Sequence, residues 1–204
     1  MRALEPPPLA SLARKTDSWF ARAQAALLSQ VPCRTGCCHC CIGPFPITRL
    51  DVDRLQEGLK TLPPDRREYI ERRANEQVSL FETAYPRLRQ SPYLDGWSDT
   101  DIDRLVSDFH QSCPSLGEDG LCLLYEYRPL TCRSMGIPAE EGGVVTGACA
   151  VQTFVPIVRL SAALRAEEDA LSQQEAQALE ADNSIGGPEG EELLLPYGLL
   201  RHIE

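Results

Sequence analysis

The stretch Cys33-Arg34-Thr35-Gly36-Cys37-Cys38-His39-Cys40-Cys41 contains five cysteines in nine residues. Thiolates are soft ligands, and a set of pure sulfur selects zinc, copper(I) or an iron–sulfur centre over magnesium, calcium or manganese. Spacings of two or three residues let a tight turn aim several sulfurs at one ion, and Gly36 supplies backbone freedom for such a turn. We therefore expect this stretch to form a metal-binding loop.

Four more cysteines follow at wide spacing along the chain. With the spaced members of the first stretch they make the expected metal ligands: Cys33, Cys37, Cys40, Cys41, Cys113, Cys122, Cys132 and Cys149. Eight cysteine sulfurs suit either two four-sulfur centres, or one four-sulfur centre with four further cysteines that support it. Adjacent cysteines ligate one small ion only with strain, so Cys40 and Cys41 serve different centres or one of them supports the other. The roles of Cys38 and His39 stay open.

Charge and hydropathy restrict the partners and the compartment. The formal net charge is −10 and no basic run is present, which disfavours nucleic-acid backbones and anionic membrane surfaces. No apolar run approaches the roughly 20 residues that span a bilayer, and the first residues lack a hydrophobic signal core. We expect a cytoplasmic protein, and in that reducing compartment clustered cysteines bind metal or do redox chemistry more often than they form structural disulfides.

Hydrophobic spacing predicts a mainly α fold with small β elements, including a short hairpin, organised around a cysteine metal site. The expected helices cover residues 11–30, 48–60, 65–89, 99–110, 161–181 and 191–204, and a short one after Pro129 carries Cys132. The hairpin is expected over residues 113–127, with Tyr125 in a strand and in the core. Residues 144–145 and 153–158 are strands or buried coil.

The domain organisation that we expect has three parts. Residues 1–30 form an N-terminal helical arm, residues 31–158 form the cysteine-cluster metal-binding domain, and residues 159–204 form a C-terminal helical extension that packs on the domain. The length of 204 residues suits one domain of ordinary size with an appended arm.

Two blocks of this sequence resemble the YkgJ-like (CxxCxxCC) cysteine-cluster family, which is described as zinc- or iron-chelating. The first block runs from Cys33 to Cys41 and is followed by Ile47-Thr48 and Asp51. The second runs from Cys113 through Cys122 to Cys132-Arg133, with the sequence Tyr-Glu-Tyr-Arg-Pro between its last two cysteines. The resemblance covers roughly residues 31–150 and implies metal binding. Seven of the expected ligands match the family pattern position by position, Cys149 fits its looser last cysteine, and Cys38 is an extra.

The cysteines also allow two other interpretations of the protein, as an enzyme or as a metal-free thiol redox protein. The spacing from Cys33 to Cys40 matches that of radical enzymes using S-adenosylmethionine, but the repeated strand–helix units of those barrels are lacking. A flagellin lysine N-methylase is a distant relative of the family, yet no Gly-rich strand–helix turn for S-adenosylmethionine is seen. Disulfides between adjacent cysteines are strained, which disfavours the metal-free alternative.

The sequence therefore predicts a cytoplasmic metal-binding protein that holds an iron–sulfur cluster or zinc. Iron–sulfur is favoured over zinc because numerous, widely spaced cysteines suit a buried site for a larger cluster. Arg128 and Arg133 beside Cys132 either stabilise the negative charge of such a centre or pair with acids such as Glu126. The partner is the metal ion or cluster, with no nucleic acid and no membrane, and a protein partner is left open.

Overall fold

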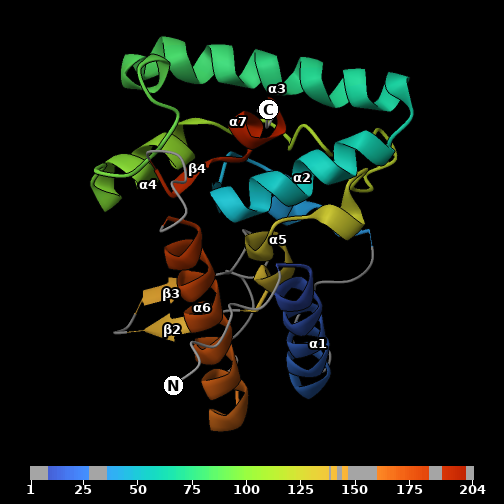
Figure 1. Cartoon of the computed structure of the whole chain (residues 1–204), viewed down its shortest axis with the longest axis vertical. Helices are drawn as coiled ribbons and strands as arrows, with labels where there is room; N and C mark the ends of the chain where they lie inside the picture. Colours follow the sequence, from blue (N-terminus) through green and yellow to red (C-terminus); the bar gives the residue numbers. More distant parts are fainter. Residues whose placement is uncertain are drawn as a thin grey trace. The chain divides into compact units, whose positions relative to one another are not determined.

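The computed structural model describes residues 9–27, 36–137, 139–141, 144–146, 160–183 and 190–200 (Figure 1). The described part is mainly helical with two small antiparallel sheets, which confirms the predicted fold class. The chain divides into two compact units, Met1–Thr35 with Leu130–Pro188 and Gly36–Pro129 with Glu189–Glu204. These boundaries differ from the three parts expected from the sequence, and that division stays a prediction.

The second unit contains most of the cysteines and is built from short and long helices around a two-stranded sheet. Its elements are η2 (His39–Cys41), β1 (Pro46–Thr48), α2 (Arg49–Thr61), α3 (Pro64–Ala84), η3 (Pro86–Arg89), α4 (Asp99–Asp108), η4 (Tyr125–Tyr127), β4 (Glu192–Leu194) and α7 (Leu195–Leu200). Helix α7 packs against both α2 and α3 (Figure 1). None of the helices in the described ranges is long and apolar enough to cross a membrane.

The C-terminal segment enters the second unit as a strand and not as a single helix. Strand β4 pairs antiparallel with β1, and Ile47 lies opposite Leu193, both fully buried. Only Leu195–Leu200 is helical in the described part of the tail, so the helix expected over 191–204 begins later than predicted. The pairing partner lies far away in the sequence, and a local hydrophobic pattern does not reveal it.

Helix α3 is predicted well at its start and too long at its end. Pro64 occupies the first turn, where a missing N–H costs nothing. The helix ends at Ala84 because Pro86 disfavours the α conformation of the residue before it and removes a backbone donor. Residues 86–89 continue as the separate 3₁₀ turn η3.

The segment 113–127 is a tight turn and not a regular hairpin. A single antiparallel bridge joins Leu116 to Cys122, and the N–H of Gly117 donates to the carbonyl of Leu121 at 2.8 Å. Residues Tyr125–Tyr127 form the 3₁₀ helix η4, so the strand expected at Tyr125 is wrong. The side chain of Tyr125 is 51% exposed, so its expected place in the core is wrong as well.

The first unit contains α1 (Leu9–Leu27), α5 (Leu130–Ser134), α6 (Ala162–Asn183) and the short hairpin of β2 (Ala139–Glu141) with β3 (Val144–Thr146). Helix α1 packs against α5 and α6. Trp19 is central to the core here, and its indole N–H donates to the carbonyl of Leu164 at 2.9 Å. The helices expected at 11–30, 161–181 and after Pro129 are confirmed in their described parts, while residues 153–158 lie outside the described ranges.

Candidate metal centre

The predicted ligands fall in three places of the described chain. Cys37, Cys40 and Cys41 lie with Cys38 in the loop over residues 36–43, and Cys113 and Cys122 lie in the loop over residues 112–124, both in the second unit. Cys132 lies on α5 of the first unit. Cys33 and Cys149 lie outside the described residues. The cysteines of the described ranges are thiols and not disulfides.

Backbone hydrogen bonds join the two loops of the second unit. The N–H of Cys113 donates to the carbonyl of Cys41 at 2.7 Å, and the N–H of Gly43 donates to the carbonyl of Gln111 at 2.8 Å. Between these two bonds, Ile42 forms an antiparallel bridge with Ser112. The fold therefore brings the end of the first cysteine block beside the start of the second.

The 36–43 loop needs glycine at both ends. Gly36 has a φ of +83°, a left-handed conformation that uses the backbone freedom expected of glycine in this turn. The turn continues through η2, where the N–H of Cys41 donates to the carbonyl of Cys38 at 2.9 Å. Gly43 has a φ of +87°, and a Cβ there would lie 3.1 Å from the carbonyl oxygen of Phe109. A larger residue at position 43 would push this loop away from Phe109 at the end of α4.

The 112–124 loop is held from outside by helix α3. Arg73 Nη1 donates to the carbonyl of Leu116 at 2.7 Å, and Arg73 Nη2 donates to Ser112 Oγ at 2.6 Å. One turn further along the helix, Gln77 Nε2 donates to the carbonyl of Ser112 at 2.8 Å. Sequence reasoning missed Arg73 and Gln77, because nothing in a helical pattern reveals which distant loop a polar side chain will contact.

Cys113 and Cys122 share one local arrangement. Each sulfur is hydrogen-bonded by the backbone N–H two residues later, from Ser115 and Leu124 respectively. Burial still dominates, because it raises the pKa of Cys113 to about 12 and raises the pKa of Cys122. N–H donors of this kind stabilise a metal-bound thiolate, so both turns suit a ligand once a metal displaces the proton.

Cys40 has the opposite electrostatic environment. Its pKa is lowered to about 7, chiefly by a hydrogen bond with the Cys41 side chain and also by its own backbone N–H and the charge of Arg128. The Arg128 charge also lowers the pKa of Cys122, whereas the charge of Cys40 raises it. The pKa of Cys40 therefore depends on Cys41 and Arg128, and the pKa of Cys122 depends in part on Arg128 and Cys40. The guanidinium of Arg128 stacks on the ring of Tyr125 at 4.0 Å.

The two arginines considered from the sequence have different surroundings. Arg128 acts on the cysteines of the second unit, as described above. Arg133 is 3% exposed and forms an ion pair with Asp17 of α1. For Arg133 the structure therefore favours pairing with an acid.

The described residues contain no preformed ligand cage. Across the described ranges, no group of three or more His, Cys, Asp or Glu side chains is arranged to hold a metal ion. Two predicted ligands lie outside those ranges, so the eight-cysteine set stays a prediction. The donor chemistry of the joined loops, thiols with N–H donors on their sulfurs and a guanidinium nearby, fits zinc or iron–sulfur and not an oxygen-seeking ion.

A comparison with protein families matches residues 32–150 to the family model CxxCxxCC, "Putative zinc- or iron-chelating domain". No curated protein and no solved structure gave a significant match. The matched range covers both cysteine-bearing loops and extends to Cys149.

Proposed function

Because this chain belongs to the CxxCxxCC family, we propose that it is a cytoplasmic metal-binding protein whose clustered cysteines hold an iron–sulfur cluster or zinc. The proposed ligands are Cys33, Cys37, Cys40, Cys41, Cys113, Cys122, Cys132 and Cys149. When bound, the metal cross-links distant parts of the chain, and an iron–sulfur cluster would also carry an electron. The cytoplasm is proposed because it keeps thiols reduced.

The observation that supports this proposal best is the hydrogen bond from the N–H of Cys113 to the carbonyl of Cys41. It joins two loops that are far apart in the sequence, and each carries cysteines of the matched family. The charge of Cys40 raises the pKa of Cys122, which supports the same proposal. The two joined loops therefore carry soft donors from both sequence blocks, which supports a shared metal centre.

An iron–sulfur cluster is the first form that we propose, and zinc is the second. A four-thiolate site with either metal carries a net charge of about −2. The charge of Arg128 acts to lower the pKa of Cys40 and, against the larger effect of burial, that of Cys122, so it favours the thiolate form of both. The N–H donors of Ser115 and Leu124 act in the same direction and, with a cluster, would raise its reduction potential.

The test is elemental analysis and a visible absorption spectrum of protein made and purified without oxygen. Iron with acid-labile sulfide, and an absorbance that bleaches on reduction, supports the cluster. Stoichiometric zinc in a colourless protein supports the second form. Protein that binds neither metal, and that takes up neither on reconstitution, refutes the proposal.

Single substitutions identify the ligands. Cys113→Ser and Cys122→Ser should each lower the metal content at least tenfold after dialysis against a chelator. Cys38→Ser, in the 36–43 loop, is the control, and it should retain the metal because the family pattern does not require this cysteine. Retention of full metal by both Cys113→Ser and Cys122→Ser would rule out the ligand assignment, whatever metal is present.

A further inference from the structure

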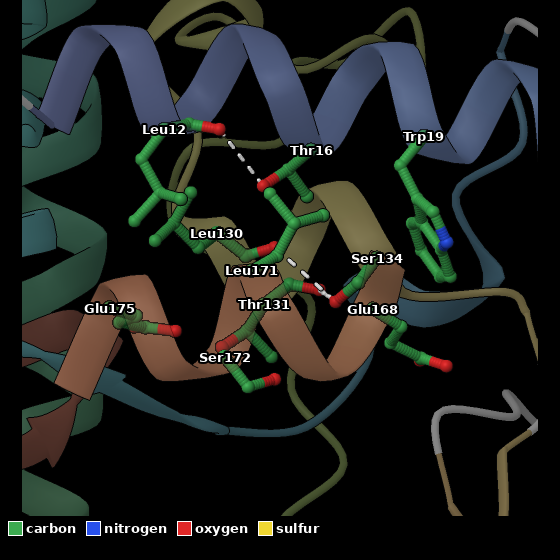
Figure 2. Close-up of a pocket in the computed structure, with 10 residues that line it drawn as sticks. All are labelled: Leu12, Thr16, Trp19, Leu130, Thr131, Ser134, Glu168, Leu171, Ser172 and Glu175. Atoms are coloured by element: carbon green, nitrogen blue, oxygen red, sulfur yellow. Dashed lines mark hydrogen bonds between the residues drawn. The ribbon is translucent and has the colours of Figure 1, made fainter. Parts of the chain in front are cut away.

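The first unit contains a cavity of about 160 Å³ between α1, α5 and α6 (Figure 2). Its apolar walls come from all three helices: Leu12 and Trp19 on α1, Leu130 on α5 and Leu171 on α6. An apolar cavity of about 150 Å³ is large enough to hold benzene. The space therefore suits a ligand with an apolar body the size of one aromatic ring or a short alkyl chain.

Two hydroxyls in the wall of this cavity donate their protons to backbone carbonyls. Thr16 Oγ1 donates to the carbonyl of Leu12 at 3.0 Å. Ser134 Oγ lies 3.4 Å from the carbonyl of Leu130 and 3.3 Å from that of Thr131, and donates within its own helix (Figure 2). A hydroxyl has one proton and two lone pairs. Toward a ligand, Thr16 and Ser134 therefore act as hydrogen-bond acceptors.

Helix α6 adds two carboxylates, Glu168 and Glu175, and the residues that line the cavity include no lysine or arginine. Arg165 Nη1 donates to one oxygen of Glu168 at 2.6 Å. A carboxylate has about four lone-pair positions, so this bond leaves acceptor capacity on Glu168. The polar part of the wall thus consists of hydroxyl acceptors and two carboxylates, of which Glu168 is paired with Arg165, and it complements a ligand that carries positive charge and several N–H donors.

From this complementarity we propose that the cavity is a binding site for a small organic cation, a primary ammonium attached to an apolar body. The ammonium group donates to one of the two carboxylates of α6 and to a hydroxyl beside it, and the apolar body contacts Trp19 and the leucines. The ammonium suits the site because it has three donors and no acceptor. The proposal does not depend on metal binding, since none of the lining residues is a predicted ligand.

The probe for this site is benzylamine, and benzyl alcohol is its neutral counterpart of nearly the same size. Both are titrated into the full chain by calorimetry, and the indole N–H of Trp19 is followed by NMR as the local reporter. Benzylamine should bind saturably and at least tenfold more tightly than benzyl alcohol, and the Trp19 signal should shift. Equal affinity for the two compounds, or no saturable binding of benzylamine, would overturn the proposal.

Variants separate the two parts of the recognition. Glu168→Gln with Glu175→Gln should weaken benzylamine at least tenfold, whereas Glu180→Gln, at an exposed position of the same helix, should leave it unchanged. Leu171→Trp should abolish binding by filling the space. If that variant does not fold, Ser172→Phe provides the same test, because Ser172 lines the cavity from an exposed position. Undiminished binding by the variant that fills the space, or an equal loss with Glu180→Gln, would contradict the assignment.

Discussion

Replacing Arg73 with methionine should loosen the loop that carries Cys113. Methionine keeps most of the aliphatic length of arginine but removes all its donors. Those donors contact Tyr69 Oη at 2.9 Å, Leu116 O at 2.7 Å and Ser112 Oγ at 2.6 Å, with two longer contacts of 3.3 Å to Pro114 O and Ser112 O. The substitution therefore leaves several acceptors of one loop without their donor.

The magnitude follows from these contacts. A hydrogen bond from a charged group contributes about 1.5–3 kcal/mol. The three short contacts share one guanidinium that is only partly buried, and water can replace some of them, so their contributions do not add in full. We expect Arg73→Met to lower the free energy of opening of the 112–116 loop by about 2–4 kcal/mol. Because about 1.4 kcal/mol corresponds to a factor of ten, the amide of Cys113 should exchange with solvent at least roughly 30-fold faster.

Hydrogen exchange of the Cys113 and Leu116 amides, measured by NMR in metal-free protein, is the assay. These amides donate to Cys41 O and Cys113 O, so they report on the loop directly. Arg72→Met is the matched control, since Arg72 is exposed on the same helix and its guanidinium stacks 5.7 Å from the centre of the Tyr69 ring. If Arg73→Met exchanges no faster than Arg72→Met, helix α3 does not hold the loop and the reasoning fails.

Three further predictions concern the second unit. Gly58→Ala should destabilise the second unit by about 1–2 kcal/mol in chemical denaturation, because the new Cβ would lie 2.6 Å from Tyr127 Cγ and this overpacking exceeds the gain of about 1 kcal/mol in helix propensity. Unchanged or higher stability would contradict the close packing. Phe81→Ala should lower the free energy of unfolding by about 3–5 kcal/mol in the same measurement, because Phe81 is fully buried and packs edge-on against Phe109. A decrease of less than about 1 kcal/mol would show that this is not a core contact. In metal-free protein, iodoacetamide labelling of Cys40 should rise between pH 6 and pH 8 with a midpoint near pH 7, because its lowered pKa of about 7 makes the thiolate abundant above that pH. Cys113 should stay unlabelled over this range because its pKa is raised to about 12. Mass spectrometry that finds Cys113 labelled before Cys40 would refute this order.

Local sequence signals account for most of the helices. Ser98 begins α4 by accepting a hydrogen bond from the N–H of Asp101, and the acids of the first turn favour that end of a helix. Pro64 marks the start of α3, and Pro86 marks where it ends. Signals of this kind act within a few residues, so they can be read without knowledge of the fold.

The errors at the tail and at Tyr125 have one physical origin. Strand β4 forms because Leu193 meets Ile47 across a register that no local pattern encodes. At Tyr125, η4 replaces the expected strand and packs against α2, where Arg54 Nη2 donates to the carbonyl of Glu126 at 2.7 Å. In both places contacts with other segments override the local preference.

For the candidate metal centre too, the sequence indicates some features and only the tertiary structure shows the others. The number of cysteines, their short spacings and the glycine at position 36 already indicate soft-metal chemistry, because ligand type and chain reach are properties of the sequence itself. Only the tertiary structure shows that the Cys113 loop lies against Cys41, that α3 holds it through Arg73, and that Cys113 is buried. These contacts join residues far apart in the chain, and their free energy depends on burial, which exists only once the chain has folded.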